Sequence, residues 1–396
     1  MTKMIELADL IGQAAADEVV ALRRRLHANP EIGMDTAETA EAVEAALARM
    51  GITDIERFAG NGLAAAVQGG RPGPMIGFRA DMDALPIQEE TDLPYKSTRA
   101  KRAHLCGHDG HTAGLVAFAH WLVQHKNDFA GTAVLIFQPG EEGYAGADKM
   151  IQDGLFEKFP VKEMYGIHNA GLLPFGKIRV RAGAMSAAAD LVEFTVEGKG
   201  GHGARPHQAI DPMPAAASLI LTLQTVVSRS VDPQEAGVVS LCAIEGGDPG
   251  APSVIPQRIR IAGTTRSLAP EVRDLIEQRC RETAAGVGLA TGTQIECRYT
   301  RLYPPLMNDK ALLSALTPVL IESFGRENVE TEFKPAMGGE DFAFFAQKVP
   351  SVFFHLGIAD ETHACSMHHP KFDFNDRIFG AWVTLLTDVL KARSAA

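Results

Sequence analysis

The sequence predicts an α/β protein built on a mixed, mostly parallel sheet, with a smaller ferredoxin-like α+β domain inserted into it. Four short apolar runs, at 75–79, 132–138, 163–167 and 351–356, alternate with stretches of helical periodicity. Such runs are typical of strands that are buried on both faces of a parallel sheet. Between about Ser186 and Arg301 the pattern changes to β-α-β-β-α-β, the order of a ferredoxin-like unit. We therefore expect a first domain in two parts, 1–185 and 302–396, around an inserted domain, 186–301.

The elements of the first domain follow from apolar spacing and from the residues that end helices. Apolar residues recur at helical spacing over 9–27 and again over 36–50, where Gly51 provides a stop. Strand-like runs at 62–68 and 75–79 are separated by a Gly/Pro turn, and a helix follows over 112–122. Residues 1–17 lack the basic start, apolar stretch and cleavage site of a signal peptide, so we expect them to begin a helix.

The inserted domain shows strand-like alternation at 191–197, 238–244, 258–265 and 293–299. Its two helices are expected at 212–227 and 270–285, each opened by a proline in the first turn.

Composition narrows the class of function. The chain has 396 residues and a formal net charge of −11, which disfavours binding to nucleic acid or to an anionic membrane surface. No apolar run reaches the roughly 20 residues that a membrane span requires. The five cysteines are odd in number and scattered, so a disulfide framework is not expected and the reducing cytoplasm is favoured.

Side chains of the kinds that bind metal ions come directly after three of the strands: Asp81, Asp83, Glu141, Glu142 and His168. In an open α/β sheet, ligands bind beyond the carboxyl ends of the strands, so these side chains should meet there. Cys106 and His108 lie in a glycine-containing loop before a helix, at a spacing that lets both reach one divalent ion. His368 and His369 follow the last run, and we expect only one of them to be a ligand.

The adjacent carboxylates Glu141 and Glu142 indicate metal-assisted proton transfer. Like charges this close oppose each other's ionisation, and a metal ion bound by one of them relieves the conflict. The other carboxylate is then free to take a proton from a metal-bound water. The set of potential ligands is too large for one tetrahedral ion and suits a pair of ions: Cys106, His108, Glu142, His168 and His368.

Several nearby residues have roles that the sequence alone leaves less defined. Asp83 and Asp109 are expected to orient the ligand imidazoles from behind. For Asp81, a ligand, an orienting partner and a strand-end cap all stand as interpretations. His111 starts a helix, where a hydrogen-bonded structural histidine is more common than a ligand.

Two features of the inserted domain are candidates for substrate binding. The glycine-rich segment 198–207 carries His202, which suits an oxyanion stabiliser, although a plain hairpin with an exposed histidine also fits. Arg266, at a strand end, would bind a substrate carboxylate bidentately or else form an exposed salt bridge.

These motifs together resemble the aminoacylase/hippurate hydrolase branch of the di-metal peptidase and amidohydrolase superfamily. They run through the chain in the family's order: Arg79-Ala-Asp-Met-Asp-Ala-Leu-Pro, Cys106-Gly-His-Asp-Gly-His, Gln138-Pro-Gly-Glu-Glu-Gly, Gly166-Ile-His, Gly200-Gly-His-Gly-Ala-Arg-Pro-His, Gly339-Glu-Asp-Phe and His368-His-Pro. The resemblance implies a catalytic first domain, an inserted lid that also dimerises, and a site for two divalent ions (Zn, Mn, Co or Ni).

Residue by residue, the resemblance places the ligands at Cys106, His108, Glu142, His168 and His368. It places the general base at Glu141 and matches His202 to a lid histidine that reaches the reacting carbonyl across a dimer. Ser253 and His369 depart from the family pattern, since relatives carry other residues there, and are expected to line the substrate pocket.

The sequence therefore predicts a cytoplasmic amidohydrolase, a homodimer or higher homo-oligomer, that cleaves N-acyl amino acids or related N-acyl amines by attack of a metal-bridging water. A dipeptidase or carboxypeptidase with the same mechanism is the alternative. A metal-binding protein without catalysis is disfavoured because Glu141 and the whole ligand set are present.

Overall fold

The computed structural model describes residues 5–394, and this part of the chain divides into two compact units. The larger unit contains the residues up to Met185, then Met307–Lys334, and the chain from Asp341 on. The inserted unit contains Ser186–Leu306 together with the short segment Pro335–Glu340. Residues 1–4 of the expected helical start lie outside the described residues.

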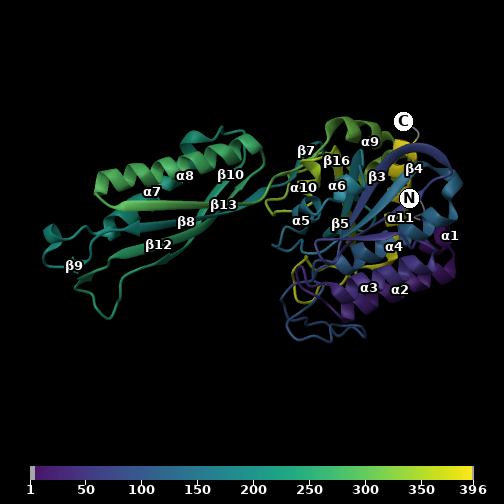
Figure 1. The fold of residues 1–396 in the computed structure, drawn as a ribbon, viewed down its shortest axis with the longest axis horizontal. Helices are drawn as coiled ribbons and strands as arrows, with labels where there is room; N and C mark the ends of the chain where they lie inside the picture. The colour runs from purple at the N-terminus through teal and green to yellow at the C-terminus, as the bar shows by residue number, and fades with distance from the viewer. Residues whose placement is uncertain (1–4, 395–396) are drawn as a thin grey trace. The chain divides into compact units, whose positions relative to one another are not determined.

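The larger unit is built on an eight-stranded sheet in the order β1-β2-β4-β3-β5-β16-β6-β15 (Figure 1). Its central strands β4, β3, β5 and β16 run parallel, while β1, β2 and β6 pair antiparallel with a neighbour. The mixed, mostly parallel sheet is therefore confirmed. The strands are β1 (Ile55–Phe58), β2 (Gly62–Gln68), β3 (Arg71–Asp81), β4 (Ala130–Gln138), β5 (Glu163–Pro174), β6 (Ile178–Arg179), β15 (Val329–Glu330) and β16 (Ser351–Ala359).

Helices cover both faces of this sheet. One face packs against a continuous core that includes Phe78, Phe118, Tyr165 and Trp382. The helices on that side are α1 (Leu7–Ile11), α2 (Gln13–Ala28), α3 (Ala37–Arg49), α4 (His108–Gln124), α9 (Lys310–Phe324) and α11 (Phe379–Ser394). Shorter helices pack on the other side: α5 (Gly146–Gln152), α6 (Leu155–Lys158) and α10 (Ala343–Ala346).

Several boundaries differ from the sequence prediction. The helix expected from Thr112 already begins at His108, β3 is longer than the run 75–79, and α8 continues to Thr291. The single helix expected over 9–27 is interrupted at Gly12, whose φ of 84° does not fit an α-helix, so α1 and α2 are separate. The strand expected to end before His168 continues to Pro174, because β16 pairs with β5 up to Ala170 and, after an irregularity, again at Pro174.

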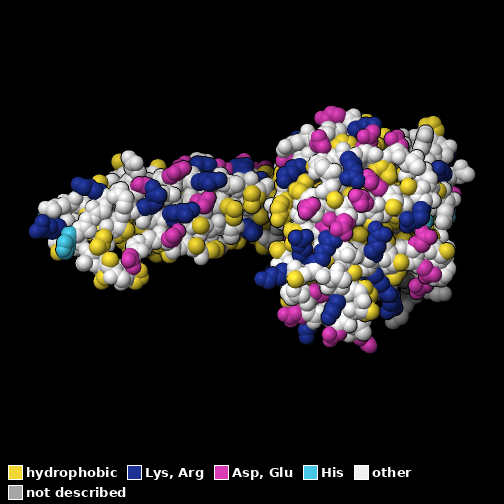
Figure 2. Space-filling model, turned by 60° about the horizontal axis from the view of Figure 1, so that its bottom comes forward, with side chains coloured by type: hydrophobic (Ala, Val, Ile, Leu, Met, Phe, Trp, Pro, Cys, Tyr) yellow, Lys and Arg dark blue, Asp and Glu magenta, His cyan; other side chains and the backbone are white. Residues whose placement is uncertain are grey.

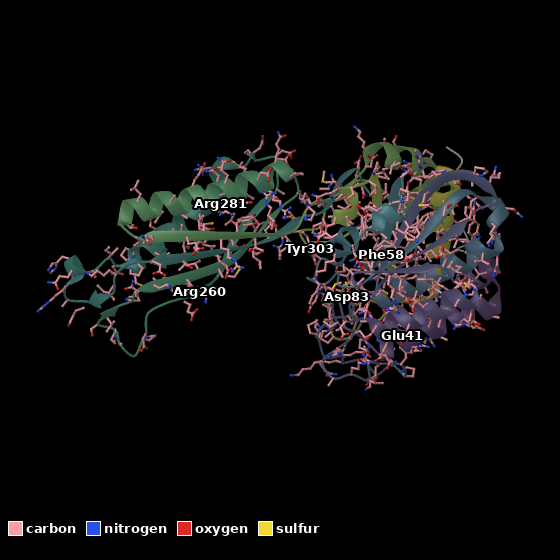
Figure 3. All side chains as sticks on the ribbon, viewed as in Figure 1. Glu41, Phe58, Asp83, Arg260, Arg281 and Tyr303 are labelled. Carbon is pink, nitrogen blue, oxygen red and sulfur yellow. The ribbon has the colours of Figure 1, made fainter. Side chains whose placement is uncertain are left out.

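The inserted unit confirms the ferredoxin-like pattern. Its sheet has the order β10-β12-β8-β13, all antiparallel, with α7 and α8 packed on one face over a core of its own. In Figure 3, Arg281 marks α8 and Arg260 marks the sheet. The elements are β8 (Ala188–Glu197), α7 (Pro212–Ser230), β10 (Gly237–Glu245), β12 (Arg258–Ser267), α8 (Pro270–Thr291) and β13 (Gln294–Tyr303). A two-stranded ribbon, β9 (Gly201–His202) with β11 (Val254–Ile255), extends from it.

Acidic and basic side chains are interspersed on the surface shown in Figure 2. Within residues 5–394, no helix combines the length and the apolar character that crossing a membrane would require.

Candidate metal centre

The first part of the site is the loop that enters α4. Gly107 has φ of 94°, in the left-handed region that favours glycine, and α4 begins at the next residue, His108. A side chain at Gly107 would also collide with Asn169, because its Cβ would lie 2.1 Å from Asn169 Oδ1. The backbone N–H of His368 donates to the carbonyl of Leu105 at 2.7 Å. This bond holds the C-terminal histidine loop against the loop that carries Cys106.

The five predicted ligands converge in the larger unit. The donor atoms of Cys106, Glu142 and His368 all lie within 4.8 Å of one another, as do those of His108, Glu141 and Glu142. Nε2 of His368 lies 3.2 Å from Oε1 of Glu142. Nε2 of His168 lies 3.5 Å from Sγ of Cys106. Thiol, imidazole and carboxylate donors brought this close are the set that binds Zn²⁺ or a similar divalent ion.

Asp83 holds the loop that carries the paired glutamates. Its two carboxylate oxygens accept the backbone N–H groups of Glu141 and Glu142, at 2.9 and 3.1 Å. Asp83, labelled in Figure 3, also lies 3.5 Å from Nδ1 of His108. It is thus next to the imidazole of one predicted ligand, and it also fixes the backbone of the two glutamates.

The environment of His108 fits a bound cation. Both of its ring nitrogens are buried and neither has a hydrogen-bond partner in the part of the chain that the structure describes. Burial opposes protonation of His108, but Asp81 and Cys106 still raise its pKa well above the ordinary value. Hydrogen bonds to Cys106 and Glu142 raise the pKa of His368 to about 10. The site therefore attracts positive charge, which divalent ions would supply.

The lowered pKa and the hydrogen bonding of His168 suit a metal ligand. Burial and the neighbouring His111 lower its pKa well below the ordinary value, so the imidazole is neutral. Its Nδ1 lies 2.7 Å from the backbone carbonyl of Asn169, to which it donates. Ligand histidines commonly make this second bond, and it leaves Nε2 to face Cys106.

Asp81 and His111 take supporting positions. His111 Nδ1 lies 2.5 Å from Asp81 Oδ1, and His111 Nε2 lies 2.6 Å from Asn169 Oδ1. Both ring nitrogens of His111 are thus engaged by protein atoms, which supports the structural interpretation. The second oxygen of Asp81 accepts from Arg79 at 2.9 Å.

The expected role of Asp109 is wrong. Its carboxylate does not orient a ligand imidazole but pairs with two residues of α2, Arg23 Nε at 2.9 Å and His27 Nδ1 at 2.8 Å. As the second residue of α4, it lies on the side of the helix that faces α2, and the sequence pattern could not show this.

The candidate substrate residues lie in both units. In the inserted unit, His202 is exposed on the β9–β11 ribbon and pairs with Val254, next to Ser253. Arg266 donates to Thr264 Oγ1 and to the carbonyl of Thr265. Among residues 5–394, no ion pair joins Arg266 to an acidic side chain, so the salt-bridge interpretation is not supported. His369 is exposed beside His368 in the larger unit.

Sequence reasoning missed four buried residues around the site: Arg79, Gln138, Asn169 and Asp341. Each lies within or next to a recognised motif, but only the tertiary structure shows that they contact one another or the ligand loops.

Comparison with known proteins places the chain among metal-dependent hydrolases. Residues 77–392 match the family described as Peptidase family M20/M25/M40. A hippurate hydrolase of Campylobacter jejuni is 38% identical over 381 residues, which are 96% of each chain. An IAA-amino acid hydrolase of Arabidopsis thaliana is 38% identical and covers 94% of this chain and 86% of its own. The crystal structure of the YXEP protein of Bacillus subtilis, a dinuclear metal-binding peptidase, superposes with a TM-score of 0.83 at 30% identity, covering 96% of this chain and 99% of its own.

Proposed function

Because the chain belongs to peptidase family M20/M25/M40, we propose that it is an N-acyl-amino-acid amidohydrolase whose centre is the cluster around Cys106. The chain is a metal-dependent hydrolase of amide bonds. The observation that carries the proposal is that the five proposed ligands lie in three overlapping groups of close donor atoms within one unit, one of which includes Glu141.

We propose two divalent ions per subunit, held by Cys106, His108, Glu142, His168 and His368. The number of ligands exceeds what one tetrahedral ion takes, and the YXEP relative is described as dinuclear. A thiolate ligand favours a softer ion such as Zn²⁺, while imidazole and carboxylate also accept Mn, Co or Ni. When bound, the ions would acidify water and polarise the amide carbonyl.

Glu141 is proposed as the general base and then the general acid. Asp83 fixes its backbone at the end of β4. Its carboxylate would take a proton from the attacking water and return it to the leaving nitrogen of the amide. His202 would donate a hydrogen bond to the carbonyl oxygen as that oxygen becomes negative. The residues of the chain thereby move one proton and stabilise one developing charge.

Replacing Glu141 with Gln tests this assignment. Gln has nearly the same shape but accepts no proton, so we expect turnover to fall to background. Metal content, measured by elemental analysis, should stay at the wild-type level because Glu141 is not a proposed ligand. Glu41→Gln, on the surface helix α3, is the matched control and should keep full activity. Full activity in Glu141→Gln would remove Glu141 from the mechanism.

We propose N-acyl amino acids as the substrate class. The relatives named for hippurate and for IAA-amino acids support this choice. Arg266 would bind the substrate carboxylate, and Ser253 and His369 would line the pocket. A panel of N-acetyl and N-benzoyl amino acids and of free dipeptides, assayed with and without chelator, distinguishes this activity from the dipeptidase alternative. Preferential cleavage of free dipeptides would reject the proposed class.

We further propose that the protein is a homodimer formed through the inserted unit and acts in a reducing compartment. That unit exposes Leu221 on α7 (72%) and Ile244 on its edge strand β10 (60%). All five cysteines are free, which suits the cytoplasm.

Mixing two inactive variants tests whether His202 completes the partner's site. A hybrid of Glu141→Gln and His202→Ala subunits contains one site with both groups if His202 acts across the dimer, and none if it acts within its own chain. We expect mixing to restore about half of the activity per hybrid dimer. A mixture no more active than the two variants assayed separately would place His202 in its own subunit's site.

A further inference from the structure

A series of buried polar side chains, joined by hydrogen bonds, reaches the loops that carry the proposed metal ligands. The mechanism above does not use these side chains. The series begins at Asp341, where the chain returns to the larger unit after Pro335–Glu340. Asp341 Oδ1 accepts from Arg79 Nη2 at 3.0 Å, and Arg79 Nη1 donates to Asp81 at 2.9 Å. These three residues are at most 3% exposed. One guanidinium thus joins two buried carboxylates.

The series continues to the loops that carry ligands. From Asp81 it passes to His111 and from His111 to Asn169, through the contacts of 2.5 and 2.6 Å described above. Asn169 directly follows His168 in β5, and its side chain packs against Gly107, the residue before His108. The series therefore ends against two ligand-bearing segments.

A second branch joins Asp341 to the glutamate loop. Gln138, the last residue of β4, donates to both oxygens of Asp341 at 2.8 and 2.7 Å and accepts from Arg79 Nε at 2.8 Å. The backbone N–H of Ala147, in α5, donates to Asp341 at 3.0 Å. Asp341 therefore connects β3, β4 and α5 at the edge where the ligands emerge.

We propose that Asp341 and Arg79 are positioning residues that set the affinity of the metal centre. Together they fix the carboxylate of Asp81, which in turn fixes His111 and Asn169 and thereby the spacing of the ligand loops. Residues that orient metal ligands in this way typically contribute about 10- to 100-fold in metal affinity. This inference rests on the proposed function, because it requires that the cluster binds metal.

The test is the dissociation constant for Co²⁺, measured on chelator-stripped protein by competition with a chromogenic chelator. Asp341→Asn keeps the shape of the side chain and removes its charge. Arg79→Lys keeps the charge and removes the fork that reaches Gln138, Asp81 and Asp341 at once. We expect both variants to bind Co²⁺ about 10- to 100-fold more weakly. The Co²⁺–thiolate absorption bands should also shift, because Cys106 would meet the ion at a changed geometry.

Glu163→Gln is the matched control. Glu163 is the first residue of β5, ahead of His168 in the strand, and pairs with Arg393 at 2.6 Å. The Glu163→Gln variant should have a lower melting temperature than wild type in the metal-free state and the same affinity for Co²⁺. If Asp341→Asn does not fold, Arg79→Lys alone decides the question. Wild-type Co²⁺ affinity in the folded variants, with only a lower melting temperature, would overturn the inference. Failure of the wild-type protein to bind Co²⁺ would instead reject the proposed function.

Discussion

At the scale of single residues, the hydrogen bonding of His202 determines what this side chain can do. The backbone N–H of Ala204 donates to His202 Nδ1 at 3.1 Å. A ring nitrogen that accepts a hydrogen bond carries no proton in the neutral imidazole, so the proton is on Nε2. His202 therefore presents an N–H donor at its exposed end, as an oxyanion stabiliser requires.

This arrangement predicts different outcomes for two similar substitutions. His202→Gln places an amide N–H near the position of Nε2, whereas His202→Asn places it near Nδ1. We expect His202→Asn and His202→Ala to lower kcat by about 10²–10³, the usual effect of losing an oxyanion donor. His202→Gln should retain clearly more activity than either. Steady-state kinetics on an N-acetyl amino acid decide the point, and an Asn variant more active than the Gln variant would contradict it.

The residue types of the site could be predicted from the sequence, but their contacts only in part. Cys106 and His108 could be predicted as ligands because a thiol and an imidazole at this spacing in a loop can both reach one divalent ion. Asp109 has the same neighbourhood in sequence, yet it faces Arg23 and His27 because α2 packs against that side of α4. Contacts between distant elements depend on packing, which residue spacing does not encode.

At the scale of elements, the presence of a strand was easier to predict than the residues at which it ends. The run 62–68 coincides with β2, because a turn with Gly and Pro ends it. β5 continues past its apolar run because its pairing with β16 extends over His168 and Asn169 and provides hydrogen-bond partners for the backbone there. The pairing of β3 with β5 ends at Gly166. His168 therefore lies within β5 and not after it as predicted, but beyond the part of β5 that is hydrogen-bonded to β3.

The start of α4 predicts the effect of Gly107→Ala. A side chain there must adopt a φ near 94° and also displace Asn169, which lies 2.1 Å from the new Cβ. We expect a loss of about 1–3 kcal/mol in unfolding free energy from backbone strain, together with reduced metal content. Urea unfolding and elemental analysis measure the two effects.

Gly292→Ala separates strain from collision. Gly292 directly follows α8 with φ of 70°, but, its own neighbours in the chain aside, no atom of residues 5–394 lies within 4 Å of its Cβ position. This variant should lose some stability and keep its full metal content. Equal metal content in both variants would show that Gly107 matters only for its backbone angle.

At the scale of the whole molecule, a buried histidine predicts how stability depends on pH. Burial disfavours the charged form of His27, but Asp109 and Glu89 outweigh this and raise its pKa to about 9. The native state therefore holds a proton that the unfolded chain releases near pH 6.5. This contribution to stability is present below pH 6.5 and is lost as pH rises toward 9.

Urea unfolding of metal-free protein at pH 6.5 and pH 9 measures this effect. The shift corresponds to a loss on the order of 3 kcal/mol in unfolding free energy across that range. His27→Gln should show a smaller loss over the same range, because the remaining titrating groups are common to both proteins. Identical losses in the two proteins would mean that His27 does not carry the effect.

The first and last strands of the inserted unit, β8 and β13, are hydrogen-bonded neighbours from Glu197 and Gln294 to Ala189 and Tyr303. The main part of this unit therefore begins and ends on neighbouring strands, and Pro335–Glu340 joins it as a second, separate segment. Because the unit also has its own core, it is suited to exchange between relatives as a cassette. Chimeras joined near residues 187 and 304, with Pro335–Glu340 taken from the same parent, would reveal how much of the selectivity of these enzymes is transferred with this unit.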